Sequence, residues 1–171
     1  MSKSDAIAAV AALQRLREDI AVDREAMRRH VTDVGEILAM WATEPPTRPY
    51  LVVAAVALHA WYNAIEKIFE RVAREIDKEI PSGEGWHRSL LSQATIELRG
   101  LRPPVVARTL QHDLSEILSF RHFFRHAYAV DLEPEKLRIE LARLMRVEAT
   151  IENDLDRFAM FLGDAADALA G

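Results

Sequence analysis

The sequence contains no cysteine. Disulfides and thiolate-bound metal centres are therefore excluded, both as supports for the fold and as sources of chemistry. Half of the residues are hydrophobic and 29% are charged, which is typical of a folded globular chain rather than a disordered one. At 171 residues the chain can bury a core without covalent crosslinks, and we expect a single domain spanning residues 1–171.

An excess of basic charge is also missing. The sequence has 27 acidic and 22 basic side chains, which give a formal net charge of -5. Proteins that bind nucleic acid usually present a basic surface. Any nucleic-acid site in this chain must therefore be a local patch of basic residues.

Long hydrophobic runs are absent. Residues 51–58 are among the longest such runs and are far too short to span a bilayer. Residues 1–5 lead into an amphipathic stretch rather than into the apolar segment of a signal peptide. We expect a cytoplasmic protein that does not contact a membrane.

Strand patterns are nearly absent, whereas helical periodicity extends along the whole chain. There is no sustained alternation of apolar and polar residues and no Asn-Gly or Asp-Gly turn. Ser4 is the expected cap of the first helix, and Pro49 is suited to the first turn of the second. The pattern predicts an all-α fold, an antiparallel helical bundle of four long helices plus one short helix. The expected helices cover residues 4–41, 49–80, 86–94, a stretch beginning near 104, and 134–169.

The fourth expected helix carries charge on the face that should be apolar. Four of its residues recur at helical spacing and define that face: Leu110, Leu114, Ile117 and Leu118. At about 100° per residue, Arg121, Arg125 and Tyr128 fall within about 40° of Leu114. Because unpaired arginine is almost never fully buried, we expect these groups to meet an acidic partner, line a cleft or lie at a subunit interface.

His122 and His126 lie one helical turn apart beside these arginines. The two histidines and two arginines span an arc of about 140°, a patch of the size that binds a polyanion. That arc is too wide for all four to contact one phosphate from a regular helix, unless the helix end frays or a second subunit supplies the facing half. Taken alone, such a cluster more often forms salt bridges and compensates the helix dipole.

The ordered combination Arg121-x4-His126-x-Tyr128 resembles the defining motif of HEPN-domain nucleases, and specifically that of the HepT-like toxins. Residues 59–69, with an aromatic pair followed by Ile-Glu-x-Ile-Phe, look like the second helix of that family. Residues 86–91, Trp-His-Arg-x-Leu-Leu, resemble its short mid-chain segment. The resemblance covers about residues 50–135 and implies a HEPN-like helical bundle.

The resemblance also implies roles for individual residues. Arg121 and His126 correspond to the catalytic pair, and Tyr128 to the motif tyrosine. His122 stands where the family usually has Asn or Asp, and it keeps a donor and acceptor at that position. Arg125 lies outside the minimal motif, and we expect it, with His122 and Tyr128, to support the site and contact RNA.

The residue types suit metal-independent RNA cleavage. Such cleavage deprotonates the ribose 2′-hydroxyl, stabilises a pentacoordinate phosphorane and protonates the leaving 5′-oxygen. Histidine transfers protons near neutral pH, and arginine supplies permanently charged planar donors to the phosphate. The expected products are a 2′,3′-cyclic phosphate and a 5′-hydroxyl, formed without a metal or other cofactor.

The family resemblance implies three kinds of partner. The substrate would be RNA, either tRNA or mRNA. Two copies of the chain would form a homodimer that brings both motifs into one cleft. An MNT-type nucleotidyltransferase antitoxin would silence the toxin by transferring AMP to Tyr128. Two other interpretations remain open: a non-catalytic HEPN-like module that binds a nucleotidyltransferase, and a plain helical oligomerisation protein.

Four further polar residues require an interpretation. Glu66 could pair with Arg121 and orient it, or it could be a solvated surface residue. His59 is best explained as a hydrogen-bonded histidine inside the bundle. Glu84 and His87 have the Glu-x-x-His spacing of di-iron bundles, but they straddle a glycine-rich turn and have no second copy, which disfavours a metal site.

Overall fold

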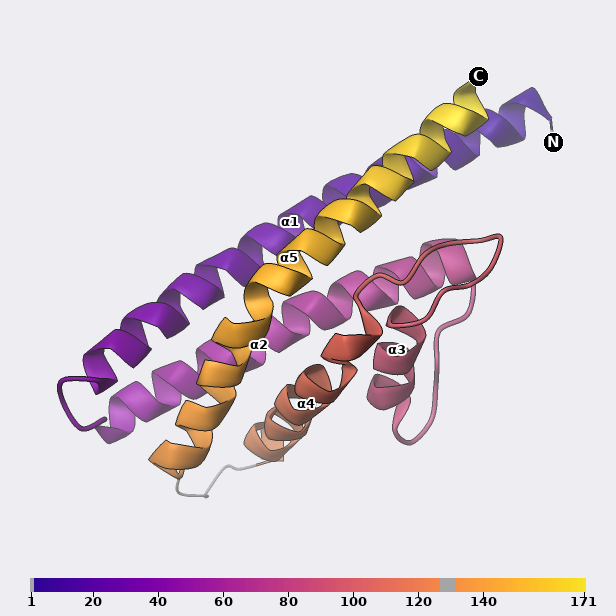
Figure 1. The fold of residues 1–171 in the computed structure, drawn as a ribbon. Helices are drawn as coiled ribbons and strands as arrows, with labels where there is room; N and C mark the ends of the chain where they lie inside the picture. Colours follow the sequence, from indigo (N-terminus) through magenta and orange to yellow (C-terminus); the bar gives the residue numbers. More distant parts are fainter. Residues whose placement is uncertain (1, 127–131) are drawn as a thin grey trace.

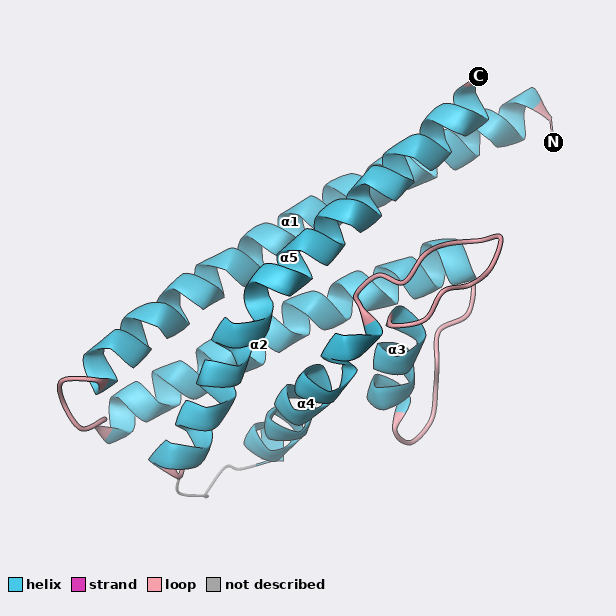
Figure 2. Ribbon diagram, viewed as in Figure 1, coloured by secondary structure: helices cyan, strands magenta, loops and turns pink. Residues whose placement is uncertain are grey.

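The protein is described by a computed structural model that covers residues 2–126 and 132–171, with the side chains of residues 125 and 126 outside this description. Within it the chain forms five α-helices and no strand, apart from one isolated bridge between Leu98 and Arg102 (Figure 2). The helices are α1 (Lys3–Trp41), α2 (Arg48–Val72), α3 (Trp86–Ala94), α4 (Gln111–His126) and α5 (Pro134–Ala170). Four long helices and one short helix confirm the predicted fold class.

The helices form a bundle around α2. In Figure 1, α1 and α5 lie side by side as a long pair, and α4 and α3 lie on the other side of α2. Helix α2 contacts all four of the others. Its buried residues include Leu58, Trp61, Ile65 and Ile68, none of which is accessible to solvent. Helix α2 therefore contributes to the core along its whole length, and the other four helices pack their apolar residues against it.

Helix α2 is also unusually apolar for its length. Together with the π-helical turn Ala73–Asp77 that follows it, it is the one helix in the described residues that is long and apolar enough to cross a membrane. However, 61% of its most apolar window is buried inside the protein. Its composition is accounted for by its place at the centre of the bundle.

The ends of three helices differ from the sequence prediction. Helix α1 is capped by Ser2 rather than Ser4, because Ser2 Oγ accepts from the Asp5 amide while the Asp5 carboxylate accepts from the Ser2 amide. Helix α2 was expected to reach Ile80, but it changes to the π-helical turn after Val72 and the turn ends before Lys78, a residue with φ of 58°.

The fourth helix begins later than predicted. Instead of starting near Pro104, the chain continues irregularly to a 3-10 turn at Arg108–Leu110 before α4 begins. The intervening backbone is already engaged elsewhere: the Val105 amide donates to the Ala94 carbonyl over 2.8 Å, and the Ala107 amide donates to Asp154 over 2.7 Å. The Ala107 amide, which a helix beginning near Pro104 would use for its first intrahelical bond, donates to α5 instead.

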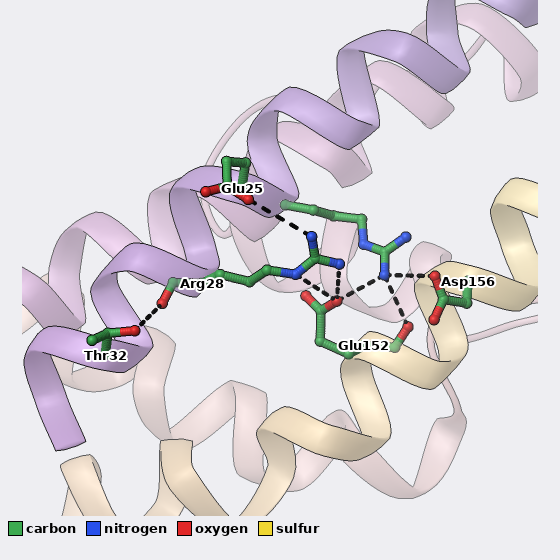
Figure 3. Close-up of polar contacts among 6 residues, drawn as sticks. Glu25, Arg28, Thr32, Glu152 and Asp156 are labelled. Carbon is green, nitrogen blue, oxygen red and sulfur yellow. Dashed lines mark hydrogen bonds and ion pairs between the residues drawn. The ribbon is translucent and has the colours of Figure 1, made fainter.

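A cluster of ion pairs joins α1 to α5. Arg24 is only 7% exposed, and its Nη2 lies 2.7 Å from both Glu152 and Asp156. Arg28, one turn further along α1, also contacts Glu152 over 2.7 Å (Figure 3). A buried arginine with two carboxylate partners has its charge compensated, which explains how it can lie between two packed helices.

Candidate active site

Arg121 lies where the apolar face of α4 ends. Leu114, Ile117 and Leu118 precede it on the same face and are fully buried. Arg121 itself is only 8% exposed. The prediction that this arginine continues the core face of the helix, and so needs a partner, is confirmed for the described residues.

The guanidinium of Arg121 is held by two residues of α2. Its Nε donates to Asn63 Oδ1 over 2.6 Å, and its Nη2 lies 3.0 Å from Glu66 Oε1. Asn63 and Glu66 are three residues apart and therefore share one face of the helix. The remaining nitrogen, Nη1, has no hydrogen-bond partner within the described part of the chain. Two sides of the guanidinium are fixed by α2, and Nη1 is buried from solvent.

Glu66 connects α4 to α3. It is 4% exposed, and its second oxygen, Oε2, lies 2.6 Å from Nδ1 of His87. One buried carboxylate on α2 thus contacts Arg121 of α4 through one oxygen and His87 of α3 through the other. Of the two interpretations of Glu66, pairing with Arg121 is the one the structure supports, and a solvated surface role is wrong.

The ring of His87 lies between two other aromatic rings. Its neighbour Trp86 stacks on it with ring centroids 3.7 Å apart and an interplanar angle of 29°. The ring of His122, from α4, approaches it edge-on with centroids 4.9 Å apart. The residue after the motif arginine therefore faces α3, and the structure gathers Arg121, His122 and His87 around Glu66.

Tyr62 lies beneath the arginine. The Arg121 guanidinium carbon is 6.0 Å from the centre of the Tyr62 ring, within the range of a cation–π contact. Burial, together with the negative charge of Glu66, raises the pKa of the Tyr62 phenol well above its usual range, and Arg121 only partly opposes this. The Tyr62 phenol is therefore neutral at physiological pH and packs against the arginine without adding a charge to the site.

His59 contacts α4 one turn further along. Its ring centroid is 5.8 Å from that of Phe124, which in turn stacks on Phe120. His59 is partly buried in this aromatic contact between α2 and α4. This placement agrees with the interpretation of His59 as a histidine of the bundle.

The rest of the motif is only partly placed. Arg125 and His126 lie in the last turn of α4, but their side chains are outside the described residues, and Tyr128 lies outside them altogether. Of the predicted catalytic pair, the structure describes the side chain of Arg121 only. The catalytic and RNA-binding roles given to Arg121, His126, His122, Arg125 and Tyr128 stay predictions.

Two residues of this site did not follow from the sequence patterns. No role was predicted for Asn63, although it is a polar residue on an apolar helix and lies three positions before Glu66. The one chemical role considered for His87 was that of a metal ligand with Glu84, whereas in the structure it contacts Glu66. Among the described residues there is no group of three or more His, Asp or Glu side chains that could hold a metal ion.

A family model described as HepT-like protein matches residues 53–162 of the chain. The match includes Asn63, Glu66, His87 and the whole of the motif from Arg121 to Tyr128, and it leaves α1 outside. No curated protein and no solved structure shows a significant match to the chain.

Proposed function

Because the chain belongs to the HepT-like family, we propose that it is a metal-independent endoribonuclease, the toxin of a type VII-like HEPN/MNT toxin–antitoxin pair in the cytoplasm. The observation that supports this best is the buried Arg121, which begins the R-x4-H-x-Y motif. Asn63 and Glu66 orient its guanidinium. An arginine held in one orientation is suited to stabilising charge that develops on a phosphate.

The reaction needs one proton acceptor and one proton donor. In the proposed mechanism, neutral His126 takes the proton of the ribose 2′-hydroxyl, and the 2′-oxygen attacks the adjacent phosphorus. Arg121 stabilises the pentacoordinate phosphorane. The bond to the 5′-oxygen breaks as that oxygen receives a proton from a second acid, which in a homodimer would be His126 of the second copy. The products are a 2′,3′-cyclic phosphate and a 5′-hydroxyl.

A homodimer would also account for the acidic net charge. Two motifs facing one cleft would double the local number of basic groups without making the whole surface basic. His122 and Arg125 would contribute to this patch beside the catalytic pair. Regulation would follow from Tyr128, because AMP transferred to its hydroxyl by an MNT-type nucleotidyltransferase adds bulk and negative charge where the RNA phosphate must lie.

The proposal is tested with the purified chain and structured RNA, including tRNA, in the presence of EDTA. We expect cleavage that leaves 2′,3′-cyclic phosphate ends and that is lost in His126→Ala. The matched control is His112→Ala, an exposed histidine near the start of the same helix. RNA degradation that survives His126→Ala, or a strict requirement for a divalent metal, would overturn the assignment. An inert chain that still binds a nucleotidyltransferase would favour the non-catalytic module instead.

A further inference from the structure

We propose that His87, on α3, is a positioning residue of the Arg121 site and acts through Glu66. The inference rests on the proposed function, because it assumes that Arg121 acts on RNA. It assigns α3 to the active site in addition to α2 and α4. The reaction requires Arg121 to present its guanidinium in one orientation, and His87 would fix the carboxylate that sets that orientation.

The first step in the argument is the geometry of the shared carboxylate. Glu66 Oε1 lies 3.0 Å from Arg121 Nη2, and Glu66 Oε2 lies 2.6 Å from His87 Nδ1. A glutamate side chain that contacts one partner can still rotate about its terminal bond. Partners on both oxygens, coming from two different helices, define the plane of the carboxylate. That plane in turn fixes the position of Oε1, the oxygen that accepts from Arg121 Nη2.

The second step concerns the orientation of the His87 ring. An ionised carboxylate only accepts hydrogen bonds, so Nδ1 of His87 must carry a proton and donate it to Glu66. Trp86 covers one face of the ring, and His122 contacts it edge-on. The ring is thus restrained by residues on both sides. His87 in this position fixes Glu66 in the way that the aspartate of a catalytic triad fixes its histidine, with the roles of carboxylate and imidazole exchanged.

The third step is that α3 does not need this polar contact to pack. Helix α3 buries Leu90, Leu91 and Ala94 against the core, so apolar contacts hold it there independently of the polar contact of His87. A buried ionic pair is often no more stabilising than a well-packed apolar one of similar volume. An apolar residue at position 87 would then serve the fold as well. The histidine lies instead at the end of α3 that faces the motif, which indicates a role in the site.

The activity test compares two variants whose side chains have the same number and branching of heavy atoms. His87→Leu removes the donor to Glu66, whereas His87→Asn keeps an N–H donor near the place of Nδ1. We expect kcat for RNA cleavage to fall roughly 10- to 100-fold in His87→Leu, with KM changed less than about twofold, because misplacing a catalytic group affects the transition state more than substrate binding. His87→Asn should recover most of the lost kcat. His112→Ala is the control and should behave as the unmodified protein.

A purely structural role predicts a different result. Thermal unfolding of each variant is measured alongside the kinetics. Equal loss of kcat in His87→Leu and His87→Asn at unchanged thermal stability would overturn the proposal, and so would a change confined to KM. A kcat that is close to normal in His87→Asn but reduced in His87→Leu supports the proposal.

A second measurement does not depend on catalysis. The Nε–H of Arg121, which donates to Asn63, is observed by ¹⁵N-resolved NMR and assigned through its loss in Arg121→Lys. We expect a slowly exchanging signal in the unmodified protein, faster exchange with water in His87→Leu and no change in His112→Ala. Exchange that is equally slow in His87→Leu would overturn the positioning role. An unmodified protein that cleaves no RNA would refute the proposed function alone, since the exchange rates still decide whether His87 holds the arginine.

Discussion

Glu66 Oε1 lies 3.0 Å from Arg121 Nη2, and the two side chains are only 4% and 8% exposed. Neither charge can be removed without leaving the other in a poorly solvated place. The stability of the bundle and the geometry of the candidate active site therefore depend on the same pair of residues.

The first prediction follows from this interdependence. Glu66→Leu leaves the Arg121 charge buried without its carboxylate and should lower the free energy of unfolding by about 3–5 kcal/mol. The double variant Glu66→Leu/Arg121→Leu should recover much of this loss, because neither charge is then left alone. Urea unfolding of both single variants and the double variant gives the coupling energy. Additive effects of the two substitutions would contradict the pairing.

The second prediction separates the charge of Arg121 from its shape. Arg121→Lys keeps a positive charge, but a single ammonium group cannot contact Asn63 and Glu66 and still direct a donor to a phosphate. Cleavage should fall about 10²-fold or more. Single-turnover cleavage by the purified variant measures this, with its thermal unfolding as the control for folding. Near-normal activity of Arg121→Lys would show that the simultaneous contacts of the guanidinium with Asn63 and Glu66 are not needed for cleavage.

The third prediction concerns the ion pairs between α1 and α5 (Figure 3). Arg24→Ala should lower the free energy of unfolding by about 3 kcal/mol or more, since it leaves a largely buried carboxylate of Glu152 less compensated. The matched substitution is Arg28→Ala, whose side chain is 50% exposed and contacts the same carboxylate. It should cost less than about 1 kcal/mol. Similar losses for the two variants in chemical denaturation would contradict the structure here.

The fourth prediction is a pH dependence of stability carried by Asp113 on α4. Burial raises the pKa of this carboxyl, but hydrogen bonds from Arg143 and Arg146 on α5 outweigh burial and hold the pKa below its usual value. The lowered pKa stabilises the fold fully above the unfolded-state pKa of about 3.9, and this stabilisation is lost as the pH falls towards the folded-state pKa. Unfolding free energies between about pH 2 and 6 should therefore fall less steeply in Asp113→Asn than in the unmodified protein. The same dependence of unfolding free energy on pH in both proteins would show that Asp113 does not carry this stabilisation.

The fifth prediction concerns Tyr128, which lies outside the described residues. Co-expression with an MNT-type nucleotidyltransferase should add one AMP to the chain, detected by intact-mass and peptide mass spectrometry. Tyr128→Phe should remain unmodified. The modified protein should no longer cleave RNA, because the added group carries negative charge. Modification of the phenylalanine variant would place the acceptor at another residue.

The helices themselves could be predicted because their apolar residues recur at the helical period along the whole chain. The bounds of α3 agree with the sequence prediction, and α5 agrees to within one residue. The start of α4 could not be predicted, since it depends on the Val105 and Ala107 amides donating to Ala94 and Asp154, residues that belong to other helices. Periodicity reports which face of a helix is buried and contains no information about such distant acceptors.

The same limit applies to the candidate site. Arg121 could be found because a charged residue on an apolar face contradicts the helical pattern. Asn63 and His87 could not, because a polar residue that pairs with another helix looks in the sequence like any other polar residue. The pairing of Glu66 with Arg121 was one of two possibilities, and only the packing of α2 against α4 decides between them.

The order of these residues along the chain has a consequence for protein synthesis. Asn63, Glu66 and His87 are synthesised before Arg121, and a domain generally folds as a unit. On this order, no nascent fragment that ends before α4 carries a complete site. Any activity that depends on Arg121 can therefore arise only late in the translation of the chain.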